Sequence, residues 1–127
     1  MKNKLIALIC LQIVILATLV LIPPRTIVYE AYNKPQSVLA SWYGFESCVN
    51  PDCLMANGEV FNENEISCAS RTHYGKILEI SYKGKTILCP VSDKISKTYD
   101  STRVDLSKRA FETLADLDRG IIEIVIK

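Results

Sequence analysis

Short apolar runs separated by polar turns fill the chain from Val38 onward, and this spacing is typical of β strands. The clearest run covers residues 77–82, where apolar and polar side chains alternate as they do in a strand with one buried face. Lys83-Gly84 follows it and predicts a tight turn. The chain then returns through a second run over residues 85–91, so the two runs predict a β hairpin.

Three further runs predict strands. Residues 38–44 are apolar and aromatic and end at a glycine, and residues 121–127 place three isoleucines on one face. Residues 55–61 show a strand pattern around Asn57-Gly58, which is a turn signal. Pro90 lacks a backbone N–H, so we expect its strand to be bulged or at a sheet edge near its end.

One helix is predicted after these strands. Apolar residues recur at helical spacing from Leu106 to Leu117, Ser107 is a good helix cap, and Gly120 is a good helix end. Asp105 is expected to support the start of this helix together with Ser107. Many short strands with one helix in so short a chain predict a mainly β fold, a small β-barrel.

The amino terminus has a different pattern. Residues 5–22 form an apolar run that spans roughly 27 Å as a helix, close to the thickness of a bilayer's hydrocarbon core. Lys2 and Lys4 precede the run, and no clear cleavage site of small residues follows it. We therefore predict a signal anchor over residues 1–22 with its amino terminus in the cytoplasm, and keep a cleaved signal peptide as the alternative.

Residues 23–37 contain three prolines and no regular period, which predicts a tether, and the folded domain is predicted over residues 38–127. The chain has 127 residues, too few for a doubly wound nucleotide-binding fold or a TIM barrel. Residues 38–127 carry 11 basic and 13 acidic residues. A slightly acidic domain without a basic stripe argues against nucleic acid as a partner.

Four cysteines lie outside the apolar run: Cys48, Cys53, Cys68 and Cys89. An even number in a small exported domain predicts two disulfides. Spacing alone does not choose among the three pairings; we favour Cys48 with Cys53 inside one loop, and Cys68 with Cys89 between strands. The spacings do not fit paired zinc knuckles, so we predict no metal and no other cofactor.

An ordered series of short motifs then becomes recognisable: Ala40–Gly44, Met55–Phe61, Cys68–Thr72, Val91–Asp93 and Arg103–Ser107. The series resembles the rare lipoprotein A-like family of septal lytic transglycosylases. The resemblance implies a six-stranded double-psi β-barrel with one short α-helix, a fold similar to expansin and barwin domains. Enzymes of the family cut peptidoglycan glycan strands without water and leave 1,6-anhydro-muramoyl ends.

The resemblance also implies site residues. The family's catalytic aspartate corresponds to Asp93, and a motif glutamate corresponds to Glu59. Glu59 is expected to support catalysis, either by holding the sugar or by its like charge close to Asp93. One carboxyl group can protonate the leaving glycosidic oxygen and then take the proton from the sugar's own hydroxyl. The sequence departs from the family at Ser70, where a histidine is usual, and in the loop 92–96, which lacks the usual arginine, glycine and proline. From the residues alone, a turn-capping carboxylate at a strand end is the favoured interpretation of Asp93.

Trp42, Tyr43 and Tyr74 are candidate substrate-binding residues because aromatic rings stack on sugars; the alternative is that they pack in the core, as an aromatic pair at a strand end more often does. Ser70, at the position of the family's usual histidine, is the fourth candidate. We expect a monomer in the cell envelope, held to the membrane by its amino-terminal helix, that cleaves peptidoglycan glycan strands. The alternatives are an expansin-like module that binds cell-wall glycan without cleaving it, and a barrel that serves only protein contacts. A thiol nucleophile at Cys68 beside His73 is disfavoured, since Cys89 is available as a disulfide partner.

Overall fold

The computed structural model describes residues 34–127 of the chain. The predicted signal anchor and most of the predicted tether lie outside these residues. Within the described part, no helix is long and apolar enough to cross a membrane.

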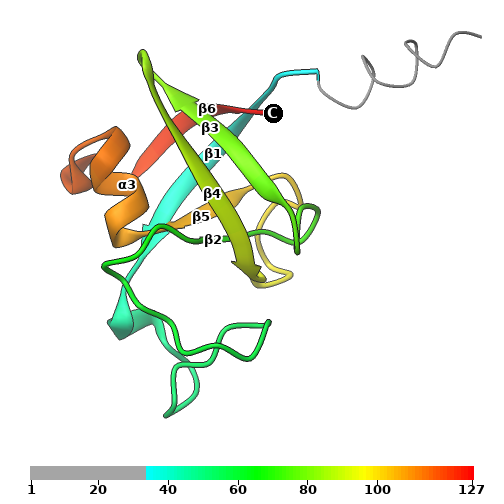
Figure 1. Cartoon of the computed structure of the whole chain (residues 1–127), viewed down its shortest axis with the longest axis vertical. Helices are drawn as coiled ribbons and strands as arrows, with labels where there is room; N and C mark the ends of the chain where they lie inside the picture. Colours follow the sequence, from blue (N-terminus) through cyan, green and yellow to red (C-terminus); the bar gives the residue numbers. More distant parts are fainter. Residues whose placement is uncertain (1–33) are drawn as a thin grey trace, which may run out of the picture. The chain divides into compact units, whose positions relative to one another are not determined.

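The described residues form a closed six-stranded barrel with one α-helix (Figure 1), so the mainly β prediction is confirmed. Around the barrel the strands follow the order β1-β5-β2-β4-β3-β6. The strands are β1 (Gln36–Tyr43), β2 (Cys68–Ala69), β3 (Ile77–Tyr82), β4 (Lys85–Asp93), β5 (Val104–Ser107) and β6 (Ile121–Ile126). The helical elements are α3 (Lys108–Leu114) and the 3-10 turns η1 (Phe45–Ser47) and η2 (Leu117–Arg119).

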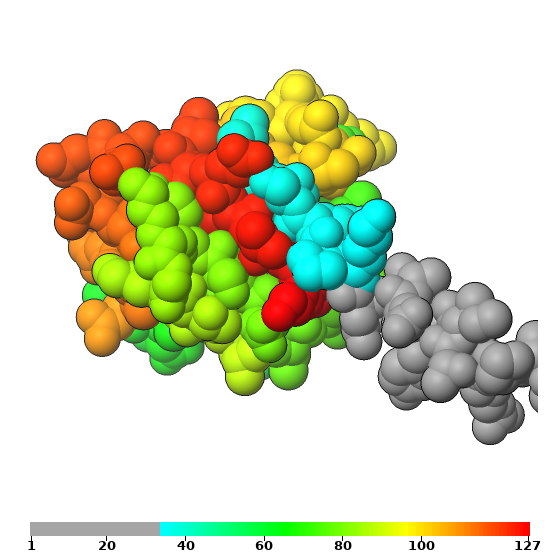
Figure 2. Space-filling view, turned by 90° about the horizontal axis from the view of Figure 1, so that it is seen from above, coloured from blue at the N-terminus to red at the C-terminus, as the bar shows by residue number. Residues whose placement is uncertain are grey.

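The strand pairing brings distant parts of the chain together. β1 runs parallel to β5, and β2 runs parallel to β4, whereas the other neighbours are antiparallel. Figure 2 shows β6 lying between β1 and β3 on one face of the barrel. Parallel strands cannot be joined by a tight hairpin, and here other strands separate the partners in the chain: β3 lies between β2 and β4, and β2, β3 and β4 lie between β1 and β5.

Alternation explains why the strands close around one core. In β6, Ile122, Ile124 and Ile126 are buried while the residues between them are exposed. The β3–β4 hairpin has the predicted turn, with both Lys83 and Gly84 at positive φ. The ladder between β2 and β4 shifts register between Val91 and Asp93, just after Pro90, which agrees with the expected irregularity near the end of that strand.

The helix α3 packs on this core but is shorter than predicted. Ser107 caps it, accepting a hydrogen bond from the backbone N–H of Ala110 at 3.2 Å. The helix ends at Leu114, not near Gly120, because Ala115 adopts an extended backbone. The apolar spacing continues into η2, a separate turn that Gly120 closes at a φ of 62°. The prediction of one continuous helix was therefore wrong at its carboxyl end.

Two other local predictions needed correction, and the predicted disulfide pairing was confirmed. Residues 55–61 form a turn closed by an isolated bridge between Leu54 and Val60, not a strand. The short strands β2 and β5 were not predicted, because neither is long enough to show a period of its own. The structure pairs Cys48 with Cys53 and Cys68 with Cys89, the pairing favoured from the sequence.

Candidate functional site

An open groove of about 600 Å³ crosses one end of the barrel. Its floor is a row of residues on four neighbouring strands: Ser41 of β1 pairs with Asp105 of β5, Asp105 with Ala69 of β2, and Ala69 with Asp93 of β4. One wall is the disulfide loop that follows β1, and the other is the segment 94–103. Because neighbouring strands lie about 4.8 Å apart, the backbones of Asp93 and Asp105 lie about 10 Å apart. Only the methyl side chain of Ala69 lies between them in this row.

Asp93 is the last residue of β4, and its carboxylate is fixed on one side only. Its Oδ1 accepts hydrogen bonds from the backbone N–H of Ala56 at 2.9 Å and of Lys94 at 2.8 Å. Its carbonyl oxygen accepts from the N–H of Ser70 at 3.0 Å. Within residues 34–127, Oδ2 has no hydrogen-bond partner. Asp93 therefore presents one oriented and unoccupied carboxylate oxygen at the groove.

Asp105 is the second carboxylate of the groove floor, and its predicted role at the start of the helix was wrong. Its Oδ1 accepts a hydrogen bond from the hydroxyl of Ser41, and the guanidinium Nε of Arg103 lies 3.5 Å from the same oxygen. Arg103 also donates to the Ser41 hydroxyl, with Nη2 at 2.6 Å. This carboxylate is charge-paired, whereas Asp93 has no ion pair within the described residues.

Glu59 lies on the exposed turn at residues 54–60 and does not line the groove. Its carboxylate accepts a hydrogen bond from the side-chain amide of Asn57 at 2.7 Å, and its backbone N–H donates to the Asn57 side chain. This turn contains Ala56, whose N–H holds Asp93, and the N–H of Asn57 donates to the carbonyl of Ser92. Glu59 is thus connected to Asp93 through the turn rather than placed beside it.

The structure shows different surroundings for the two aromatic candidates at the end of β1. The indole N–H of Trp42 donates to the carbonyl of Leu117 at 3.2 Å, and the ring packs on the barrel core. Tyr43 stacks on Phe61 with ring centroids 4.6 Å apart. Both residues contribute to the groove lining, but each ring has a protein partner.

The Tyr43 hydroxyl is itself buried. It lies close to the Ser67 hydroxyl, although neither meets the geometry of a hydrogen bond within the described residues. Burial raises the pKa of the Tyr43 hydroxyl well above its usual value, and the charges of Asp93 and Asp105 raise it further. The phenol therefore stays protonated at neutral pH.

Ser70 and Tyr74 both lie outside the groove lining. Ser70 is fully buried, and its hydroxyl lies 3.2 Å from Nδ1 of His73. Burial, with a smaller contribution from Lys76, lowers the pKa of His73. Tyr74 is partly exposed, with the Lys94 ammonium 4.5 Å from its ring centroid. A substrate in the groove would therefore not reach the Ser70 hydroxyl directly.

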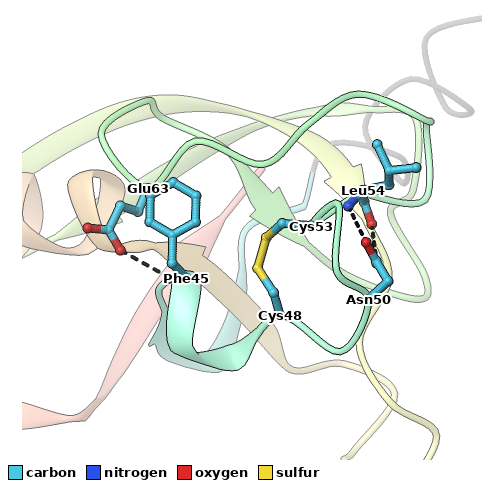
Figure 3. Close-up of a disulfide and its surroundings, with 6 residues drawn as sticks. All are labelled: Phe45, Cys48, Asn50, Cys53, Leu54 and Glu63. Atoms are coloured by element: carbon cyan, nitrogen blue, oxygen red, sulfur yellow. Dashed lines mark hydrogen bonds between the residues drawn. A yellow bond between two sulfur atoms is a disulfide. The ribbon is translucent and has the colours of Figure 1, made fainter.

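The disulfide loop that forms one wall is held in shape by several contacts (Figure 3). The Cys48–Cys53 disulfide closes it, and the Asn50 side chain both accepts from the N–H of Leu54 at 2.7 Å and donates to the Leu54 carbonyl at 3.1 Å. At its base, the N–H of Phe45 donates to Glu63. Val49, near the tip of the loop, is fully exposed.

Sequence reasoning missed Tyr99 and Arg103 as groove residues. Tyr99 belongs to the segment 94–103, which has no strand or helix period, so no pattern placed it beside β1. Arg103 begins the motif Arg103–Ser107, but the motif indicated only the family and not a place in the groove. In the part of the chain that the structure describes, no cluster of three or more histidine, cysteine, aspartate or glutamate side chains is arranged to hold a metal ion.

Comparison with known proteins adds family information to this geometry. The family described as lytic transglycolase matches residues 36–126. A papain inhibitor of Streptomyces mobaraensis is 50% identical over 48 residues, which make up 38% of this chain and 33% of that protein. The chain therefore aligns with only about a third of the length of this curated relative.

Solved structures agree on the fold. The Streptomyces papain inhibitor has a TM-score of 0.60 at 27% identity, over 74% of this chain and 93% of that one. Two structures of a Clavibacter michiganensis expansin, one a point mutant in complex with cellohexaose and one without ligand, have TM-scores of 0.58 and 0.60. Their identities are 18% and 20%, and each match covers 74% of this chain and 50% of the expansin.

Proposed function

The chain belongs to the lytic transglycolase family, and on this premise we propose that it binds peptidoglycan glycan strands in the groove and cleaves them without water. Within the family we assign it to the rare lipoprotein A-like type, with Asp93 as the acid and base. The observation that carries the proposal is the state of Asp93: one carboxylate oxygen is fixed by two backbone N–H groups, and the other is unbonded at an open groove.

The proposed reaction uses one carboxyl group twice. The protonated Oδ2 of Asp93 gives its proton to the glycosidic oxygen as the bond from that oxygen to the muramoyl C1 breaks. The sugar's own 6-hydroxyl then bonds to C1, and its proton returns to the Asp93 carboxylate. The products are a shortened strand and a 1,6-anhydro-muramoyl end, and the enzyme recovers its starting protonation state.

Glu59 has a supporting part in this proposal. Its bonds to Asn57 shape the turn that supplies the Ala56 N–H to Asp93, so it positions the acid without touching the substrate. Asp105, paired with Arg103, gives the groove a second fixed carboxylate that can accept sugar hydroxyl hydrogen bonds. The Trp42 and Tyr43 rings support the groove wall.

The proposed setting is the cell envelope. Two disulfides are typical of proteins outside the cytoplasm. The apolar run over residues 5–22 would tether the barrel to the membrane and keep it close to the glycan strands. We propose that the barrel acts as a monomer.

A digest of purified peptidoglycan by the full-length chain tests the proposal. Intact sacculi and glycan strands stripped of stem peptides are incubated with the wild type or with Asp93→Asn, and mass spectrometry measures 1,6-anhydro-muramic ends. Ends produced by the wild type and not by the variant are expected. If neither protein yields ends while both sediment with the glycan, the barrel is an expansin-like binding module. Two observations favour this alternative: Ser70, in place of the family histidine, is buried, and the expansin structure contains bound cellohexaose.

A second candidate function is inhibition of a papain-like protease. It is favoured by the 50% identity to a papain inhibitor over 48 residues, and by the rigid disulfide loop with the fully exposed Val49. Rigid, preorganised loops lose little conformational entropy when they enter a protease cleft. The test is papain activity against a peptide substrate with increasing amounts of the full-length chain and of Val49→Asp. Inhibition by the wild type that the variant loses would support this function, and unchanged papain activity would exclude it.

A further inference from the structure

We propose that Tyr99 is the sugar-stacking residue of the groove, an inference that rests on the proposed glycan-binding function. Tyr99 lines the groove and is 47% exposed, and in the described structure no aromatic ring stacks on it. The aromatic residues suggested by the sequence are placed differently: Trp42 packs on the core, Tyr43 stacks on Phe61, and Tyr74 lies outside the groove lining. Among these tyrosines and the tryptophan, Tyr99 is the one whose ring is free to meet a ligand in the groove.

The ring of Tyr99 is supported from one side. The guanidinium carbon of Arg103 lies 4.7 Å from the ring centroid, a cation–π contact. Arg103 is in turn held by two hydrogen bonds to the Ser41 hydroxyl and by its ion pair with Asp105. One face of the Tyr99 ring therefore contacts the Arg103 guanidinium, which is itself held at the groove floor. The other face of the ring remains available to a ligand.

The backbone around Tyr99 is fixed as well. The Arg71 side chain donates to the Tyr99 carbonyl through Nη2 at 2.7 Å, and the Thr72 hydroxyl donates to the Ser101 carbonyl at 3.3 Å. Both Arg71 and Thr72 belong to the motif Cys68–Thr72. Through their hydrogen bonds this motif holds the segment 94–103 against the barrel. Because the ring is already ordered, stacking a ligand on it costs little conformational entropy.

The chemistry of the groove fits a chain of pyranose rings. A sugar ring has an apolar C–H face, which packs on an aromatic ring, and equatorial hydroxyls that bond to polar groups around its edge. Tyr99 offers the aromatic face. Asp93, Asp105 and Ser96 line the same groove and offer hydrogen-bond acceptors. The substrate class is therefore a strand of pyranose rings lying along the groove, with one ring on Tyr99.

The test measures binding of full-length protein to stripped peptidoglycan glycan strands by co-sedimentation. All proteins carry Asp93→Asn, so that cleavage does not consume the ligand. We expect Tyr99→Ala to raise the apparent dissociation constant about tenfold or more, as for truncation of an aromatic anchor. Tyr99→Phe, which keeps the ring, should bind as its parent does. Tyr74→Ala is the matched control, a tyrosine of 37% exposure outside the groove lining, and should also bind as its parent.

The outcomes separate this inference from the function it rests on. Equal affinity of Tyr99→Ala and its parent would overturn the assignment of Tyr99 while leaving glycan binding intact. Equal losses in Tyr99→Ala and Tyr74→Ala would also overturn it, because the effect would then not belong to the groove. No binding by the parent would overturn both proposals together. Unchanged thermal midpoints of the variants establish that the fold is intact.

Discussion

Removing the Asp93 side chain is expected to loosen the turn at residues 54–60 as well as to abolish the proposed chemistry. In the structure, Oδ1 of Asp93 joins two backbone N–H groups: that of its neighbour Lys94 and that of Ala56, which is 37 residues earlier in the chain. Asp93→Ala deletes both bonds. Asp93→Asn keeps an oxygen in the same place, so the turn should remain attached to β4.

The size of the effect follows from the type of bond. A hydrogen bond to a charged group contributes about 1.5–3 kcal/mol to stability, and one to a neutral group about 1 kcal/mol. Asp93 is only half buried, so solvent weakens both bonds. We therefore expect Asp93→Ala to lower the free energy of unfolding by about 2 kcal/mol, and Asp93→Asn by about 0.5–1 kcal/mol.

Urea denaturation of the two variants and the wild type measures these differences. Amide hydrogen exchange at Ala56 supplies a local readout, since its N–H is bonded in the wild type and unbonded in Asp93→Ala. The reasoning is refuted if the alanine and asparagine variants lose equal stability, or if Ala56 exchanges at the same rate in wild type and Asp93→Ala.

Other predictions concern the core, the disulfide and pH. Replacing both Cys68 and Cys89 by alanine should lower the free energy of unfolding by about 3 kcal/mol in non-reducing urea titrations, because their bond closes a loop in the unfolded chain; no change would contradict this. Phe111→Ala, at a fully buried ring, should cost about 3–5 kcal/mol, whereas Val49→Ala at the loop tip should cost under about 0.5 kcal/mol; similar thermal midpoints would disprove the assignment of the core. Because the pKa of His73 is lower in the folded chain than in the unfolded chain, the unfolded chain binds the proton more tightly. The contribution of neutral His73 to stability is therefore present above about pH 6.5 and is lost as the pH falls through the lowered pKa. His73→Asn should flatten this decline in unfolding experiments at a series of pH values, and an equally steep decline would show that another group causes it.

Much of the barrel was predictable because its longer strands carry their own periodicity. The β3–β4 hairpin and β6 alternate over six or more residues, and a glycine marks the hairpin turn. β2 has two residues and β5 has four, too few to show a period, and their pairing is set by partners distant in the chain. Only the motif series, through the family resemblance, indicated a six-stranded barrel.

The site was less predictable than the fold. The motifs identified Asp93, which the structure places in the groove, although its catalytic role remains a proposal. They did not show that Ser70 is buried or that Glu59 lies on an exposed turn, because burial depends on how loops fold back over strand ends. Tyr99 lies in a segment without any period, held by side chains from a motif 28 residues earlier. Only the three-dimensional arrangement reveals such a contact.

The most direct test of the central claim is a digest of stripped glycan strands in water enriched in heavy oxygen, with wild type and Asp93→Asn compared by mass spectrometry. If Asp93 drives a lytic reaction, wild-type product ends contain no heavy oxygen and lack the mass of one water, and Asp93→Asn forms them at a rate lower by about a hundredfold or more. Heavy oxygen in the new ends would show hydrolysis instead. Equal rates for the two proteins would show that Asp93 is not the acid.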